Sequence, residues 1–135
     1  MARALRFDYS SYARFGFLLF AIVMSIAVAA AERPFDRAAF EAAQKSGKPV
    51  LLTVHADWCT TCRAQEPIVA SLLSQPQYSS FATFRVDFDK QKDVLRQFRV
   101  QYQSTLIVYK DGKEISRTTA LTDPAGIEKQ LRQAL

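Results

Sequence analysis

The chain has 135 residues, of which 49% are hydrophobic and 23% are charged. This length fits a single domain, and this composition excludes a disordered or low-complexity chain. The formal net charge is +5, but the charged residues are scattered. The scatter excludes a concentrated basic surface, so we expect no nucleic-acid partner.

The N-terminal residues 1–31 have the three parts of a secretory signal peptide. Arginines precede an uncharged stretch, residues 15–31, which ends in a run of alanines. This pattern directs a chain to export, and we expect cleavage after Ala31, with Ala29 as the alternative position. The uncharged stretch approaches the minimum length of a membrane span, so an uncleaved N-terminal membrane anchor is the competing interpretation, and a buried core helix is a third. Both export interpretations place residues 32–135 outside the cytoplasm.

The first predicted elements of the exported part are a helix, a strand and a second helix. Asp36 can cap a helix that runs to about Ser46, and Gly47 follows its end. Residues 50–54 form a continuous aliphatic and β-branched run, which is typical of a strand buried on both faces. The next helix is expected over residues 59–74, where apolar side chains recur at helical spacing.

Alternation predicts a strand over residues 81–88, and Asp89 is expected to cap a short helix to about Phe98. Two more strands, residues 105–109 and 114–119, are joined by an Asp-Gly pair that favours a tight hairpin turn. The last helix is expected to begin with an Asp cap and a first-turn proline. Its apolar face is expected to consist of Ile127, Leu131 and Leu135.

The order of these elements is αβαβαββα. Strands linked by helices pair in parallel with helices on both faces of the sheet, and the final hairpin adds antiparallel pairing. The sequence therefore predicts an α/β fold, a three-layer αβα sandwich around a four-stranded mixed sheet.

Two cysteines, Cys59 and Cys62, stand at the predicted junction between the buried strand and the second helix. Residues three apart in a first helical turn lie on one side of the helix and can form a disulfide. The free N–H groups and positive dipole end there stabilise a thiolate, so Cys59 can attack a disulfide and Cys62 can resolve the mixed disulfide. We expect Cys59 to be the more exposed of the two. A purely structural disulfide is the alternative, but so short a loop constrains the unfolded chain weakly.

The single histidine, His55, lies four residues before Cys59 and opens a second possibility. Two cysteines and one histidine could bind a metal in a copper chaperone, although such a site is short of ligands. A non-catalytic binding module with an idle dithiol is a further alternative. We expect no cofactor and no metal for the exchange reaction itself.

Residues 56–63, with the sequence Ala-Asp-Trp-Cys-Thr-Thr-Cys-Arg, and Pro67 one turn later resemble the active-site segment of the thioredoxin superfamily. With the preceding Ser-Gly-Lys-Pro-Val-Leu-Leu of residues 46–52, the chain is most similar to exported bacterial members. One of these is the periplasmic C-terminal domain of the transmembrane electron-transfer protein DsbD. The similarity covers nearly all of residues 35–135, and it implies that residues 32–135 form a thioredoxin-like domain.

The resemblance also implies roles for individual residues. Cys59 would be the attacking thiol and Cys62 the resolving thiol of a redox-active Cys59–Cys62 disulfide. Trp58 would flank the pair, and Pro67 would bend the helix. The hydroxyls of Thr60 and Thr61 could hydrogen-bond a thiolate or could only cap the helix, and we favour capping.

The chain departs from the family pattern at two positions. Ser104, before Thr105, stands where most thioredoxins have a cis-proline, so we predict a trans peptide between Gln103 and Ser104. The Ser104 N–H and hydroxyl would lie near the sulfurs and could tune the thiolate or alter substrate docking; neutral drift is the alternative. Thr53 stands where many thioredoxins bury a carboxylate, so Cys62 would lose its proton through water, a hydroxyl or the substrate.

These observations predict an exported, periplasmic thiol–disulfide oxidoreductase that acts as a monomer through a Cys-Thr-Thr-Cys dithiol. Its partners would be disulfides of other exported proteins. The resemblance to the periplasmic reductive branch implies a reductant, recharged by a membrane electron donor of the DsbD or CcdA kind.

Overall fold

The computed structural model describes residues 32–135, so the predicted signal peptide or anchor lies outside the described residues. A mixed sheet with the strand order β1-β3-β2-β4-β5 forms the centre. The strands are β1 (Arg33–Pro34), β2 (Val50–His55), β3 (Ala82–Asp87), β4 (Thr105–Lys110) and β5 (Lys113–Thr119). The helices are α1 (Arg37–Lys45), α2 (Thr60–Leu73), the short 3-10 helix η1 (Pro76–Tyr78), α3 (Lys92–Gln97) and α4 (Pro124–Arg132). Among these described helices, none combines the length and apolarity needed to cross a membrane.

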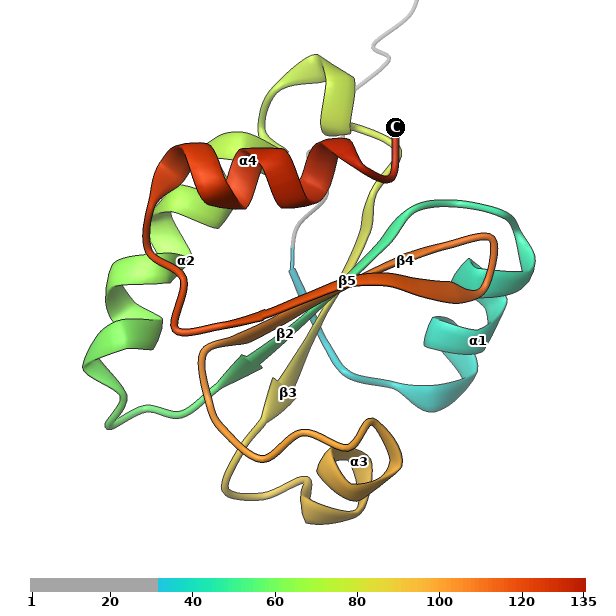
Figure 1. Ribbon diagram of the computed structural model, residues 1–135. Coiled ribbons are helices and arrows are strands. Elements are labelled where there is room, and N and C mark those ends of the chain that lie inside the picture. Colours follow the sequence, from blue (N-terminus) through green and yellow to red (C-terminus); the bar gives the residue numbers. More distant parts are fainter. Residues whose placement is uncertain (1–31) are drawn as a thin grey trace, which may run out of the picture.

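The molecule has three layers, as predicted. Helices α1 and α3 cover one face of the sheet, and α2 and α4 cover the other (Figure 1). An apolar core lies on each face: Phe40 of α1 packs on the first, and Val69 of α2 and Ile127 of α4 pack on the second. Burial on both faces explains why β2 is a continuous apolar run rather than an alternating one.

The pairing of the strands follows the predicted mixture of directions. β2 runs parallel to β3 and antiparallel to β4, and β4 forms a hairpin with β5. At the hairpin turn, Asp111 and Gly112 have φ angles of 50° and 72°, the left-handed values that a tight two-residue turn requires. The helix caps at Asp36 and Asp123 are confirmed, because each carboxylate accepts a hydrogen bond from the backbone of the first turn.

Four details differ from the predictions. The sheet has five strands rather than four, because the two-residue β1 pairs in parallel with the outer edge of β3 and is too short to show a periodic pattern. The helix η1 was not expected. α3 begins after Gln91 rather than at Asp89, whose carboxylate binds the Trp58 indole instead. Leu135 is exposed, because α4 ends at Arg132.

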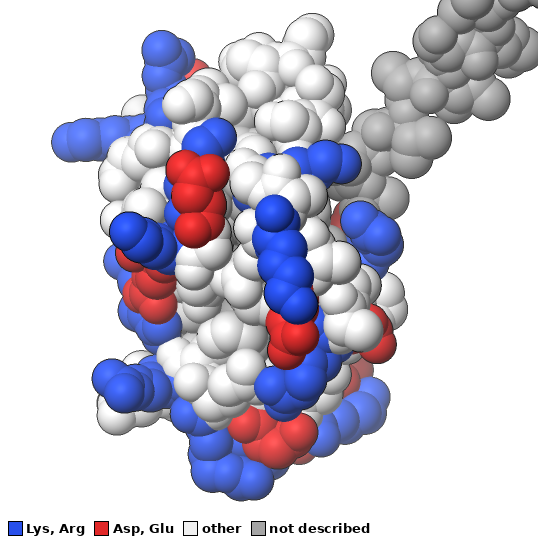
Figure 2. Space-filling model, turned by 90° about the vertical axis from the view of Figure 1, so that its right-hand side faces the viewer, with Lys and Arg blue, Asp and Glu red and all other residues white. Residues whose placement is uncertain are grey.

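Charged side chains of both signs are interspersed on the face that Figure 2 shows. Among the charged side chains of residues 32–135, Arg117 pairs with Glu114 and Lys90 pairs with Asp87. Such exposed pairs contribute little to stability, but they keep the surface free of a large field of one sign.

Candidate functional site

Both cysteines are held by the turn between β2 and α2. Cys59 is the N-cap residue of α2, and its Sγ accepts a hydrogen bond from the Cys62 N–H at 3.0 Å. Thr60 and Thr61 are the first residues of the helix, so the predicted capping by a threonine hydroxyl is replaced by capping through the Cys59 sulfur. A sulfur at this place receives the positive end of the helix dipole and a free N–H group, the arrangement that stabilises a thiolate.

Cys59 and Cys62 are joined by a disulfide, with their Cα atoms 5.3 Å apart. Each cysteine is only 3% exposed, so the expected difference in exposure is wrong. Ala56 and the half-buried Phe88 pack against the pair, and Ser104 contacts both sulfurs. These neighbours cover Cys59 as fully as the helix covers Cys62.

Ser104 lies directly against the disulfide. Its Oγ is 3.1 Å from Cys59 Sγ and 3.0 Å from Cys62 Sγ. None of the peptide bonds in residues 32–135 is cis, which confirms the trans bond expected before Ser104, and its φ angle is 57°. Its N–H donates to the Val54 carbonyl at 2.8 Å, and Thr105 follows as the first residue of β4.

Two exposed aromatic side chains lie in segments next to the dithiol. Trp58, adjacent to Cys59, is 59% exposed, and Tyr102, two residues before Ser104, is 62% exposed. The Trp58 indole Nε1 donates to Asp89 Oδ2 at 2.8 Å, and its ring meets the edge of Phe88 at a centroid distance of 6.4 Å. These contacts hold Trp58 in place while leaving much of its ring open to a partner.

The two remaining predicted site residues lie inside α2 and at the start of β4. Pro67 lies inside α2 on its exposed side, where it removes a backbone N–H from the helix. The Thr105 hydroxyl donates to the Tyr102 carbonyl at 2.8 Å and so fixes the end of the loop that carries Ser104.

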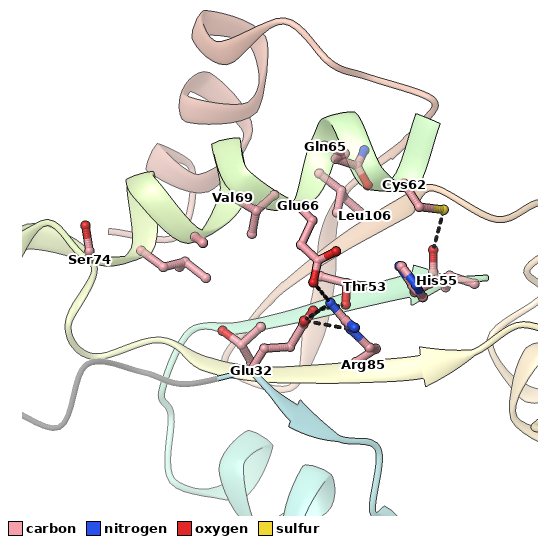
Figure 3. A pocket seen from close by; sticks show the side chains of 14 residues that line it. Glu32, Thr53, His55, Cys62, Gln65, Glu66, Val69, Ser74, Arg85 and Leu106 are labelled. Carbon is pink, nitrogen blue, oxygen red and sulfur yellow. Dashed lines mark hydrogen bonds and ion pairs between the residues drawn. The ribbon is translucent and has the colours of Figure 1, made fainter. Parts of the chain in front are cut away.

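A cavity of about 340 Å³ lies between α2 and the strands β2 and β3, and Cys62 lines one end of it. Between Cys62 and Ser74, the carboxylates of Glu32 and Glu66 point toward Arg85 from opposite sides (Figure 3). Arg85 Nε donates to Glu32 Oε2 at 2.7 Å, and the Thr53 hydroxyl donates to the other oxygen of Glu32. Burial acts to lower the pKa of Arg85, but the hydrogen bond to Glu66 and the charge of Glu32 outweigh it and raise the pKa.

The model of the thioredoxin family matches residues 32–133. The chain belongs to the thioredoxin family. Thioredoxin-2 of Saccharomyces cerevisiae is 33% identical over 93 residues, which is 68% of this chain and 86% of that protein. Thioredoxin H-type of Fagopyrum esculentum is 33% identical over 78 residues, 58% of this chain and 66% of that protein.

Among solved structures, Trxlp from Edwardsiella tarda is 44% identical to this chain, with a TM-score of 0.73, and the match covers 75% of this chain and 98% of that one. The thioredoxin of Malassezia sympodialis has a TM-score of 0.69 at 19% identity and supports the fold alone. Family membership and the Cys59–Cys62 pair make the protein a thioredoxin-type thiol–disulfide oxidoreductase.

The sequence does not predict the carboxylates that line the cavity. Thr53 carries no carboxylate, yet its hydroxyl binds Glu32, which is brought there by the pairing of β1 with β3. Nothing in the sequence marks Glu32, because it precedes a strand of two residues. Arg85 is predictable only as the polar residue of an alternating strand.

His55 lines the cavity near Cys62, and its Nε2 is 3.5 Å from Asp57 Oδ1. Within residues 32–135, no three His, Cys, Asp or Glu side chains are grouped so that they could hold a metal ion.

Proposed function

We propose that this protein is an exported thioredoxin that reduces disulfide bonds in other periplasmic proteins through Cys59 and Cys62. The observation that carries the proposal is the place of Cys59 Sγ at the N-terminus of α2, where it accepts the Cys62 N–H. The signal-like residues 1–31 support export. The resemblance to the periplasmic domain of DsbD supports the reducing direction and a membrane electron donor.

The exchange reaction has two steps that balance electrons and protons. The Cys59 thiolate attacks one sulfur of the substrate disulfide, forming a mixed disulfide and releasing the other sulfur as a thiolate that takes a proton from solvent. Cys62 then loses its proton and attacks Cys59 Sγ. The second substrate sulfur leaves and is protonated, so the substrate gains two electrons and two protons and the protein dithiol is oxidised.

The cavity behind Cys62 gives the proton of the resolving thiol a route out. It is large enough for several waters, and waters need polar partners such as the Glu32 carboxylate and the Thr53 hydroxyl. Glu32 would therefore accept the proton of Cys62 through water. With the expected cleavage after Ala31, Glu32 would become the first residue of the mature protein.

Trp58 and Tyr102 would receive the substrate. We assign this role to them because both rings are exposed and lie in the segments that carry Cys59 and Ser104. Aromatic side chains bind apolar and peptide groups of many sequences, which suits a protein that acts on several partners.

A trapping experiment tests the proposal. The full chain with Cys62→Ser, expressed in its own cell type, should accumulate as mixed disulfides on Cys59, because the attack proceeds and resolution cannot. Tryptic identification would name the partners and their compartment. The matched control is Cys59→Ser with Cys62 intact, which should trap nothing comparable. Trapped cytoplasmic partners alone, or no partner specific to Cys62→Ser, would contradict the proposal.

The direction of electron flow is tested by equilibrating the protein with glutathione buffers. A reductant should have a potential near about −270 mV, as thioredoxin does, and an oxidase should lie near about −120 mV, as DsbA does. A reduction potential closer to about −120 mV than to about −270 mV would overturn the reducing direction. It would leave the exchange chemistry intact.

A further inference from the structure

One hydroxyl group contacts both redox-active sulfurs. The Ser104 Oγ is 3.1 Å from Cys59 Sγ and 3.0 Å from Cys62 Sγ, and Ser104 is only 1% exposed, so bulk water is kept away from this contact. A disulfide sulfur has no hydrogen to give, so in the oxidised protein the serine must be the donor. A hydroxyl has one hydrogen and two lone pairs, and it can therefore donate to one sulfur while it accepts from another.

The backbone of Ser104 is held from three separate parts of the chain. Its N–H donates to Val54 of β2, and its carbonyl accepts from the Ala120 N–H at 3.0 Å and from Gln65 Nε2 of α2 at 3.3 Å. Its φ of 57° is a left-handed conformation that is unfavourable for a residue with a Cβ atom. The surrounding hydrogen bonds offset this cost and hold the Ser104 backbone at the place from which its hydroxyl reaches both sulfurs.

From these contacts we infer that Ser104 stabilises the reduced dithiol by bridging its two sulfurs. This inference rests on the proposed exchange reaction. In the reduced protein Cys59 is a thiolate and Cys62 a thiol, so the Cys62 S–H donates to Ser104 Oγ and the Ser104 O–H donates to the Cys59 thiolate. When Cys59 enters the mixed disulfide it becomes neutral, and the same O–H is then free to donate to the thiolate that forms at Cys62.

The hydroxyl favours the reduced state over the oxidised state. A hydrogen bond to a charged sulfur is about twice as strong as one to a neutral disulfide sulfur. Ser104 therefore lowers the pKa of Cys59 and makes the protein a milder reductant than the same fold without the hydroxyl. No proton is consumed by this change of partner, because Ser104 keeps its own hydrogen throughout.

The test is the titration of Cys59 in Ser104→Gly, compared with the wild type in the full chain. Glycine suits the left-handed backbone and removes only the hydroxymethyl group. We expect the pKa of the Cys59 thiol, followed by thiolate absorbance and by the rate of alkylation against pH, to rise by about one unit. The reduction potential should fall by about 30 mV for a tenfold change in the exchange equilibrium.

Two further variants separate the hydroxyl from the fold. Ser104→Ala keeps the Cβ atom and should show the same rise of the Cys59 pKa, even if its backbone strain lowers stability. Thr118→Val removes a partly buried hydroxyl that binds Gln130 Oε1 and touches neither sulfur, so its Cys59 pKa should equal that of the wild type.

A thiolate ionisation constant in Ser104→Gly and Ser104→Ala within about twofold of the wild type would overturn the inference. Such a result leaves the proposed function standing if the wild type still reduces disulfides. A wild-type protein that exchanges no disulfide would overturn the proposed function instead, whatever the pKa of the Ser104 variants.

Discussion

Ser104 and Glu32 have different roles in the chemistry of Cys62. Ser104 contacts the sulfur directly, whereas Glu32 lies across the cavity that Cys62 lines. A hydroxyl can stabilise a thiolate but does not carry a proton away at neutral pH, and a carboxylate can. Only the resolving step requires the Cys62 proton to leave, so a change at Glu32 should separate this step from the attack by Cys59.

Glu32→Gln should slow the resolving step and leave the attack by Cys59 unchanged. The amide oxygen can still accept from Arg85, and the amide nitrogen can donate to the Thr53 hydroxyl, but the side chain cannot accept the Cys62 proton. We expect release from a preformed mixed disulfide to slow by roughly 100-fold, the lower end of what a general base contributes. Acid quenching and gel analysis of the mixed disulfide would measure this rate.

The matched control is Glu66→Gln, which alters the other carboxylate that contacts Arg85. Glu66 is more exposed than Glu32 and does not bind Thr53, so its variant should resolve the mixed disulfide at the wild-type rate. If both variants resolved as fast as the wild type, the cavity would not be the route of the proton.

At the scale of the elements, the helix caps should be worth measurable stability. The Asp36 carboxylate accepts from the Ala39 N–H at 2.8 Å, and that of Asp123 from the Gly126 N–H at 2.7 Å. We expect Asp36→Ala and Asp123→Ala each to lower the free energy of unfolding by about 1 kcal/mol in urea titrations. Glu41→Ala, at an exposed position inside α1, is the control and should change it little. Losses equal to that of the control would show that the caps are not needed.

These elements also show what the sequence could predict and what it could not. Caps, turns and buried strands have local signatures, and the Asp36 cap, the Asp111-Gly112 turn and β2 were predicted from them. β1 has no such signature, because two residues cannot show a period and its position depends on pairing with a distant strand. The Asp89 cap was wrong because its carboxylate binds Trp58, an interaction between distant residues.

The same division holds for the site. The spacing of Cys59 and Cys62 is local, so the dithiol was predictable from two residues and their helix. The burial of Cys59 was not, because it is produced by Phe88 and Ser104 from other parts of the chain. Glu32 was not predicted either, because it directly precedes β1, and the position of β1 depends on pairing with the distant strand β3.

At the scale of the whole molecule, a buried tyrosine should limit stability at high pH. Burial, together with the negative charge of Glu114 and against the effect of Arg117, raises the pKa of Tyr109 to about 12 from 10.0. In the unfolded chain the phenol ionises at its ordinary value, so unfolding releases a proton between these two values. The contribution of Tyr109 is therefore complete below about pH 10 and is lost as the pH rises toward about 12.

Tyr109→Phe should flatten this alkaline decline. The phenylalanine ring keeps the edge-to-face contact with Phe40, whose centroid lies 5.4 Å away, but has no group to ionise. Urea titrations at several pH values above neutrality would compare the two free energies of unfolding, and the difference between them should grow in favour of the variant above about pH 10. A part of the decline should persist, because the pKa of Tyr78 is also raised by burial. Parallel curves for the two proteins would show that the ionisation of Tyr109 is not coupled to folding.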